Sequence, residues 1–315
     1  MTAWDAAAKQ GQWLVLLAAV LWGTTGTAQA LAPAEASPVA IGAARLFIGG
    51  TALLAVAWRQ GQVRAADWGR GPALAAAVAV ALYQVCFFAG VAATGVATGT
   101  LVAIGSAPVF TGLVQWVAAA ERPGRAWAAA TVLAVAGCAL LLGDGGQWQL
   151  NAPGIGLSLG AGAAFAVYTV ASKRLLTAVP PSGTVALAFF GGALLLSPVV
   201  FWTEWAWLAE PRGALVALHL GLVATAGAYL LFGHGLARVP APVATTLSLA
   251  EPLTAAVLGV VLLGERLSAV GWLGGGLILA GLGLLARGNG PVRRENAAPR
   301  MANSDARGQG FGQRR

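Results

Sequence analysis

Charged side chains are scarce in this 315-residue sequence. Only 10% of the residues are Asp, Glu, Lys or Arg, whereas 58% are hydrophobic. A soluble domain of this length needs far more polar surface, so the composition excludes one and favours a membrane protein. The net charge of +8 does not indicate a nucleic-acid partner, because the basic residues fall mainly between apolar stretches and in the C-terminal tail.

Groups that carry catalysis or bind metals are also few. Cys86 and Cys138 lie inside apolar runs without a CxxC spacing, so they predict neither a disulfide framework nor a metal site. His219 and His234 have no HExxH motif around them, and the sequence contains neither a Ser-His-Asp order nor a GK[ST] loop. We therefore expect no enzyme, no metal and no cofactor, and no hydrolysis of a nucleotide by this chain.

Long apolar runs account for most of the chain. A helix that crosses a hydrocarbon core of roughly 30 Å needs about 20 apolar residues. Runs of this kind predict an all-α polytopic membrane protein with ten transmembrane helices in a bacterial inner (plasma) membrane. The ten predicted spans are 13–31, 38–58, 72–91, 96–120, 126–143, 154–172, 183–202, 214–236, 242–264 and 267–286.

Two flanking segments complete the division of the chain. Residues 1–12 are expected to form a short cytoplasmic N-terminus. Residues 287–315 are rich in Gly, Asn, Ala and Arg without apolar periodicity, which is typical of a disordered tail. Between these ends we predict one five-helix repeat over 13–143 and a second over 154–286.

The distribution of basic residues indicates the orientation. With ten spans, the side of the termini carries nine Lys or Arg residues outside the tail, and the opposite side carries only Arg212 and Arg266. Because cytoplasmic loops are enriched in Lys and Arg, both termini are expected in the cytoplasm. The nine residues are Lys9, Arg59, Arg64, Arg70, Arg122, Arg125, Lys173, Arg174 and Arg238.

The two halves of the chain are related by an internal repeat. An ungapped offset of 144 residues aligns several identical residues, and an offset of 142 aligns Phe-Ile-Gly-Gly at 47–50 with Phe-Phe-Gly-Gly at 189–192. Five spans per half is an odd number, so the second half must enter the membrane in the opposite direction, as in many secondary transporters. The pairs at offset 144 are Phe88 with Phe232, Ala97 with Ala241, Pro108 with Pro252, Glu121-Arg122 with Glu265-Arg266, and Gly137 with Gly281.

With this duplication, the sequence resembles the drug/metabolite transporter superfamily, in particular its ten-span exporters made of two EamA-type domains, and among these the bacterial aromatic amino acid exporters. The resemblance covers 13–286. It implies alternating access of a central cavity lined by the first, third, fourth, sixth, eighth and ninth spans, with the fifth and tenth peripheral. The motifs that carry it are Trp22-Gly23, Ala107-Pro108, Glu251-Pro252, Glu121-Arg122 and Gly264-Glu265-Arg266.

Arg45 and Glu251 are the ionisable residues that stand out within the predicted spans. Such residues are costly, roughly 2.5–3.5 kcal/mol each, and so are candidates for function. Counted from opposite membrane faces, their depths are about 10 Å and 14 Å, which leaves only about 6 Å between them along the membrane normal. They either form a structural ion pair, bind the carboxylate and amino groups of a substrate, or do not face each other. Ala107 occupies the position equivalent to Glu251, so this carboxylate has no counterpart in the first half.

Aromatic residues away from the span ends are candidates for the walls of a substrate cavity. Trp22, Tyr83, Tyr168 and Tyr229 lie well inside predicted spans, and Gln84 adds an amide beside Tyr83. A flat substrate stacking on such rings gains about 0.5–1.5 kcal/mol per pair. Ordinary packing explains any one of them equally well. We nevertheless predict that Tyr83, Gln84 and Tyr168 line one cavity between the halves.

Two prolines inside spans predict bends. Pro108 and Pro252 each remove a backbone hydrogen bond, so their helices should kink near mid-membrane and offer candidate hinges.

These features predict a secondary transporter that exports small metabolites, with aromatic amino acids as the favoured substrate. The alternative is a broad exporter of drugs or toxic cations, which an otherwise apolar cavity around Glu251 would favour. A membrane-embedded enzyme or a channel is more remote. The expected partners are the small-molecule substrate and the lipid bilayer, and the sequence leaves the choice between monomer and oligomer open.

Overall fold

The computed structural model describes residues 3–119, 123–143, 151–264 and 266–288. Within these ranges all regular structure is helical. The predicted disordered tail lies outside the described residues apart from its first two positions, and so do Glu121, Arg122 and Glu265.

The first half contains five long helices. The second helix is capped by Ser37, which precedes Pro38 and whose Oγ accepts a hydrogen bond from the backbone N–H of Ala40. The third helix ends at Gly95, which has a φ of 82°. Their bounds are α1 Ala3–Ala30, α2 Pro38–Arg59, α3 Gly71–Thr94, α4 Val96–Ala119 and α5 Arg125–Gly143, and a 3₁₀ turn, η1 Ala65–Asp67, lies between α2 and α3.

The second half is less regular. Its first and last long helices are continuous, whereas the segments between them are broken into shorter pieces. The continuous helices are α6 Ala152–Leu175 and α12 Ala269–Gly288. Between them lie α7 Pro181–Leu195, the 3₁₀ turns η2 Ser197–Trp202 and η3 Ala206–Ala209, α8 Pro211–Leu218, the π-helix η4 His219–Gly227, α9 Ala228–Leu236, α10 Ala241–Leu247 and α11 Ala250–Leu263.

These elements form ten membrane segments, which confirms the predicted fold class. Among the described residues, nine helical segments are long and apolar enough to cross a membrane, and α7 is a shorter apolar helix. Its 15 residues rise only about 22 Å, and the predicted seventh span is completed by the 3₁₀ turn η2. At the other end of the chain α1 begins ten residues before the predicted span, because the segment that includes Gln12 and Gly11 is helical and packs against the end of α9.

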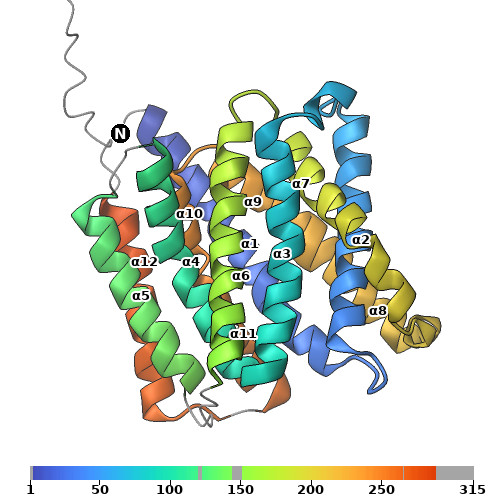
Figure 1. Ribbon diagram of the computed structural model, residues 1–315. Coiled ribbons are helices and arrows are strands. Elements are labelled where there is room, and N and C mark those ends of the chain that lie inside the picture. Colours follow the sequence, from blue (N-terminus) through green and yellow to red (C-terminus); the bar gives the residue numbers. More distant parts are fainter. Residues whose placement is uncertain (1–2, 120–122, 144–150, 265, 289–315) are drawn as a thin grey trace, which may run out of the picture.

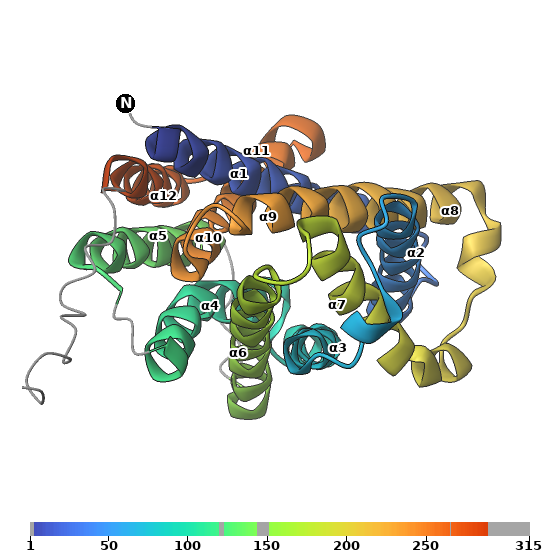
Figure 2. The same cartoon turned by 90° about the horizontal axis from the view of Figure 1, so that it is seen from above.

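The helices run roughly side by side as a bundle, and the two halves interlock rather than stand apart (Figures 1 and 2). Helices of the first half contact helices of the second throughout, as in the pairs α3 with α6, α2 with α7 and α1 with α11. α5 and α12 pack against each other at one end of the bundle in both views, so the fifth and tenth spans are peripheral. The helix ends that carry most of the described Lys and Arg residues lie on the same face as the N-terminus (Figure 1).

The two prolines expected to kink their spans behave differently. Pro108 lies inside the continuous helix α4. The ninth span is divided into α10 and α11, with a turn at Ser248 and Leu249, so its helix is interrupted three to four residues before Pro252. Pro252 has no N–H for the carbonyl of Ser248, which accepts a hydrogen bond from Glu251 N at 2.9 Å instead. The break thus lies where proline removes the normal bond.

Candidate functional site

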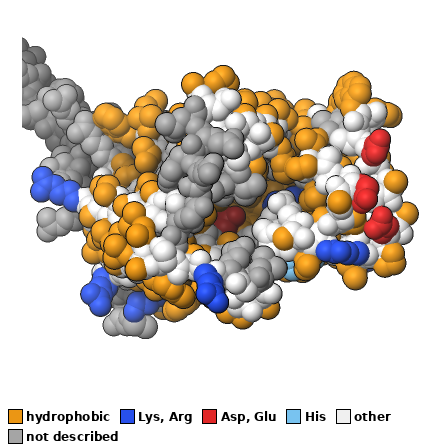
Figure 3. Space-filling model, turned by 90° about the horizontal axis from the view of Figure 1, so that it is seen from below, with side chains coloured by type: hydrophobic (Ala, Val, Ile, Leu, Met, Phe, Trp, Pro, Cys, Tyr) orange, Lys and Arg blue, Asp and Glu red, His pale blue; other side chains and the backbone are white. Residues whose placement is uncertain are grey.

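A cavity of about 280 Å³ lies between the two halves. Its outer residues belong to the end of α1 and the start of α2, so it opens on the face opposite the termini. Figure 3 views that face and shows the hollow with an acidic side chain inside it. Its lining includes Trp22, Arg45, Tyr83, Gln84, Phe87, Thr100, Phe165, Tyr229, Thr245, Ser248, Glu251 and Pro252.

Arg45 and Glu251 are the two charged side chains among the described residues that line this cavity. No ion pair joins them within the described part of the chain. Arg45 instead donates a hydrogen bond from Nε to Oγ1 of Thr225 at 3.3 Å. Of the three readings left open above, the structural ion pair is therefore not observed, and both groups face a common space.

Aromatic rings close the inner end of the cavity. The ring of Trp22 lies 4.8 Å from that of Tyr229 and 5.4 Å from that of Phe232, measured between centroids. Behind them Phe189 lies 4.0 Å from Tyr229 and 5.7 Å from Tyr168. All five are buried. They form a continuous apolar layer from α1, α6, α7 and α9 between the cavity and the face of the termini.

The wall formed by α3 combines stacking with a fixed amide. Tyr83 stacks on Phe87 with centroids 5.5 Å apart and nearly parallel rings. Gln84 is buried and donates a hydrogen bond from Nε2 to the carbonyl of Gly42 on α2, at 3.2 Å. Its carbonyl oxygen is left to accept, so this wall offers an aromatic face beside a polar acceptor.

A second, much smaller pocket of about 20 Å³ continues inward from this wall. It is large enough for about one water molecule. Its lining includes Tyr83, Gln84 and Tyr168, together with Arg45 and Tyr229, so the three residues predicted to share a cavity lie around one space.

All seven predicted binding residues thus line the cavity or the adjoining pocket: Trp22, Arg45, Tyr83, Gln84, Tyr168, Tyr229 and Glu251. Their roles in binding remain predictions. Pro252 also lines the cavity, whereas Pro108 is buried outside its lining. The resemblance did not include the second span among the cavity walls, yet that span provides Arg45.

Sequence reasoning missed several lining residues that helical spacing could have revealed. Thr245, Ser248 and Glu251 follow one another at intervals of three, which places polar groups on one face of the ninth span. Phe165 lies three residues before Tyr168, and so joins the aromatic wall by the same rule. Thr225 had no sequence signal, because a threonine inside an apolar span is common.

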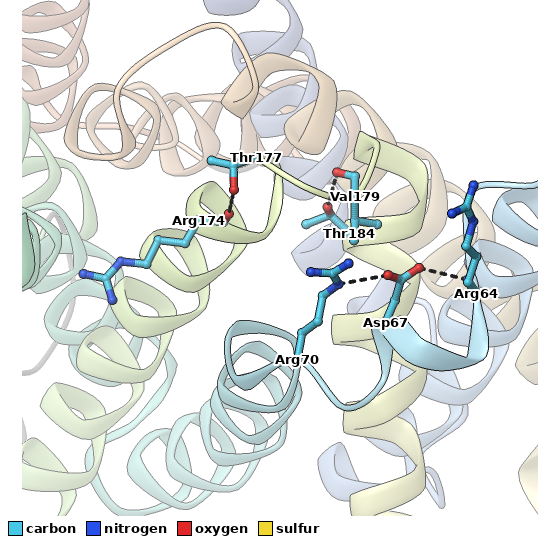
Figure 4. Close-up of polar contacts among 7 residues, drawn as sticks. All are labelled: Arg64, Asp67, Arg70, Arg174, Thr177, Val179 and Thr184. Carbon is cyan, nitrogen blue, oxygen red and sulfur yellow. Dashed lines mark hydrogen bonds and ion pairs between the residues drawn. The ribbon is translucent and has the colours of Figure 1, made fainter.

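Local polar contacts fix two of the connections on the opposite, closed face (Figure 4). Between α2 and α3, the carboxylate of Asp67 accepts hydrogen bonds at 2.9 Å from Arg70 Nε and from the backbone N–H of Arg64. The Arg70 hydrogen bond is the main cause that holds the pKa of Asp67 below its ordinary value, against the opposing effect of burial. Between α6 and α7, Thr184 donates to the carbonyl of Val179 at 3.1 Å. Both connections are therefore fixed turns.

Comparison with known proteins places this architecture among transporters. The sequence is 47% identical over 283 residues to an uncharacterised transporter, YwfM, of Bacillus subtilis (strain 168), covering 90% of this chain and 95% of the relative. It is 31% identical over 274 residues to the threonine/homoserine exporter RhtA of Escherichia coli (strain K12), covering 85% and 88%. Neither supports the narrower resemblance to aromatic amino acid exporters.

A solved crystal structure shares the fold, with a TM-score of 0.75 at 22% identity, covering 87% of this chain and 96% of the other. The EamA-like transporter family matches the sequence twice, over residues 9–143 and 152–287, once in each half. The protein is a multi-pass membrane transporter and not an enzyme, and it belongs to the EamA-like transporter family.

Proposed function

We propose that this protein exports amino acids by alternating access of the central cavity, with aromatic amino acids as preferred substrates. The observation that carries the proposal is that Arg45 and Glu251 line one cavity, among the described residues, without pairing with each other. A guanidinium and a carboxylate complement the carboxylate and ammonium groups of a zwitterion. Charges inside a membrane protein are costly, so two left apart in one cavity favour a zwitterionic ligand.

The walls support the choice of side chain. Tyr83, Phe87 and Phe165 surround the space beside Arg45, and a flat ring has aromatic faces to stack on. RhtA, one of the relatives, is named as a threonine/homoserine exporter, so small hydroxylated amino acids are the substrates to compare.

The distribution of basic residues supports an inner-membrane location with both termini in the cytoplasm. In that orientation the cavity opens to the outside and the aromatic layer around Trp22 and Tyr229 closes the path to the cytoplasm. Export then requires the halves to rearrange so that this layer opens inward while the outer mouth closes, with Pro108 and Pro252 as candidate hinges.

A drug or toxic-cation exporter is the second candidate. It would use Glu251 as the attracting charge within an otherwise apolar space. Arg45 lies in the same cavity and repels a cation, so the arrangement favours a ligand that carries both charges.

Flux into proteoliposomes tests the proposal. The purified protein should take up labelled phenylalanine saturably, with competition by tryptophan, weaker competition by threonine and homoserine, and little by lysine or a lipophilic cation. Flux equal to that of empty liposomes would refute an amino acid carrier. Competition by the cation alone would favour drug export, and flux that does not saturate would indicate a channel.

Two neutralising variants test the two charges. Arg45→Gln and Glu251→Gln each remove a charge from the contact with the substrate. A hydrogen bond to a charged group is worth about 1.5–3 kcal/mol, so apparent affinity should fall at least about tenfold in each variant. Arg59→Gln is the control, because Arg59 is an exposed residue at the end of α2 outside the cavity. Unchanged affinity in both cavity variants would contradict the proposed binding mode.

A further inference from the structure

Arg45 is held from the second half of the protein by a single side chain. Its Nε donates to Oγ1 of Thr225 at 3.3 Å, which links α2 to the π-helix η4. Thr225 is 1% exposed and lines the small inner pocket that Arg45 also lines. The contact is therefore an interior one, made between the two repeats.

The hydroxyl of Thr225 is oriented to accept this bond. Its one hydrogen is donated to the carbonyl of Leu220 at 2.8 Å, five residues earlier, in the register of the π-helix. A hydroxyl has one hydrogen and two lone pairs, so a lone pair is left for the donor Nε of Arg45. The Thr225 hydroxyl can therefore donate to Leu220 and accept from Arg45 at the same time.

A glycine contact sets the distance between the two elements. A Cβ on Gly49 would lie 2.5 Å from Cγ2 of Thr225 and 2.8 Å from the carbonyl oxygen of Gly221. A Cβ on Gly221 would in turn lie 2.5 Å from Cγ2 of Ile48. Gly49 is four residues after Arg45 and so shares its helix face. The close approach at Gly49 brings the Thr225 hydroxyl within reach of Arg45.

The bond leaves the other end of the guanidinium available. Among the described residues no hydrogen bond engages Nη1 or Nη2 of Arg45. Two parallel N–H groups on a planar guanidinium bind a carboxylate in a bidentate manner, but only when the plane is held in a fixed orientation. The hydrogen bond from Nε to Thr225 fixes the orientation of the guanidinium plane.

We propose that Thr225 is a positioning residue that gives this transporter its selectivity for a carboxylate, by holding Arg45 so that Nη1 and Nη2 meet the substrate. The inference rests on the proposed function, because it assumes a substrate with a carboxylate. Thr225 itself does not need to touch that substrate.

Comparing phenylalanine with phenylalaninamide tests the inference. The amide keeps the ring and the amino group but lacks the carboxylate. In competition against labelled phenylalanine, the wild-type protein should prefer the acid. Thr225→Val removes the hydroxyl at nearly constant shape, and should reduce the acid-to-amide affinity ratio about tenfold. Thr225→Ser keeps the hydroxyl and should retain the wild-type ratio.

Thr169→Val is the matched control. Thr169 is another fully buried threonine whose hydroxyl donates to a backbone carbonyl, that of Phe165 at 2.8 Å, and within the described ranges it makes no bond to an arginine. This variant should keep the wild-type ratio. An unchanged ratio in Thr225→Val, or an equal loss in Thr225→Ser or Thr169→Val, would overturn the positioning role.

A spectroscopic measurement separates this inference from the proposed function. With nitrogen-15 at arginine Nε, the signal of Arg45, assigned by its loss in Arg45→Lys, should exchange slowly with water in the wild type and in Thr225→Ser, and rapidly in Thr225→Val. If the wild type bound neither ligand, the proposed function would fail while this signal still reported on Thr225. Rapid exchange in the wild type would refute the positioning of Arg45 whatever the substrate.

Discussion

The contact between α5 and α12 allows a stability prediction with an internal control. A Cβ on Gly274 of α12 would lie 2.6 Å from the carbonyl oxygen of Gly137 and 2.6 Å from the backbone nitrogen of Leu141, both on α5. A Cβ on Gly276, two residues along the same helix, would meet nothing within 4 Å. We therefore compare Gly274→Ala with Gly276→Ala.

The magnitude follows from these distances. The added methyl group of Gly274→Ala is 0.8 Å short of the 3.4 Å at which ordinary contact begins, and the atoms it meets are backbone, which cannot rotate away. Overpacking of this kind costs about 1–3 kcal/mol. Alanine also favours the helix by about 1 kcal/mol over glycine, but both variants share that gain, so it cancels in the comparison.

Thermal unfolding of the purified variants in the same detergent measures the difference. At about 2–4 °C per kcal/mol, a difference of about 2 kcal/mol lowers the Tm of Gly274→Ala by about 4–8 °C relative to Gly276→Ala. Equal Tm values would refute the reasoning, because they would mean that α5 and α12 do not approach as closely as this packing requires.

Three further predictions concern the closed face and the cavity. Lys173 donates to the carbonyl of Leu236 at the end of α9, at 2.6 Å, and to that of Val239 in the following turn, at 2.8 Å. Lys173→Met should therefore destabilise the protein by about 1–3 kcal/mol in thermal unfolding, and Lys173→Arg should restore part of the loss. The folded pKa of Asp67 is below its ordinary 3.8, so its ionised form stabilises the fold above that pH, and this stability is lost as pH falls. Asp67→Asn should therefore lower the Tm at neutral pH, and the difference in Tm from the wild type should shrink at acidic pH. In a variant lacking both native cysteines, Thr100→Cys at the cavity should react with a membrane-impermeant maleimide added to whole cells. Thr177→Cys, which is exposed just after α6 on the other face, should not react; reaction at position 177 alone would reverse the proposed orientation.

Much of the candidate site was predictable because polar groups are rare in this chain. Arg45 and Glu251 stood out as ionisable residues within spans, and both line the cavity. Tyr83 and Tyr168 were predicted because they are aromatic residues away from the span ends, and both line the small inner pocket. Thr225 was not predicted, because threonine recurs inside spans without a function. Phe165 was also missed, although its spacing of three residues from Tyr168 places both rings on one face of the sixth span.

The helix breaks were only partly predictable. Pro252 marked a disturbed backbone, yet Pro108 carries the same chemistry inside a continuous helix. A missing N–H removes one bond, and the surrounding packing determines whether the helix bends or divides. The early end of α7 could not be predicted either, because residues 197–202, which form a 3₁₀ turn, are as apolar as the helix before them.

The sequence by itself determined the number of membrane segments, the inverted repeat and the few ionisable groups inside the spans, because hydrocarbon requires long apolar helices and tolerates few charges. The tertiary structure alone decided which faces of those helices meet. Lipid is as apolar as the protein interior, so the sequence of a helix that is apolar on all sides does not show which face is buried. The link from Arg45 to Thr225, the aromatic layer around Trp22 and the face on which the cavity opens therefore depend on the packing of helices from both halves.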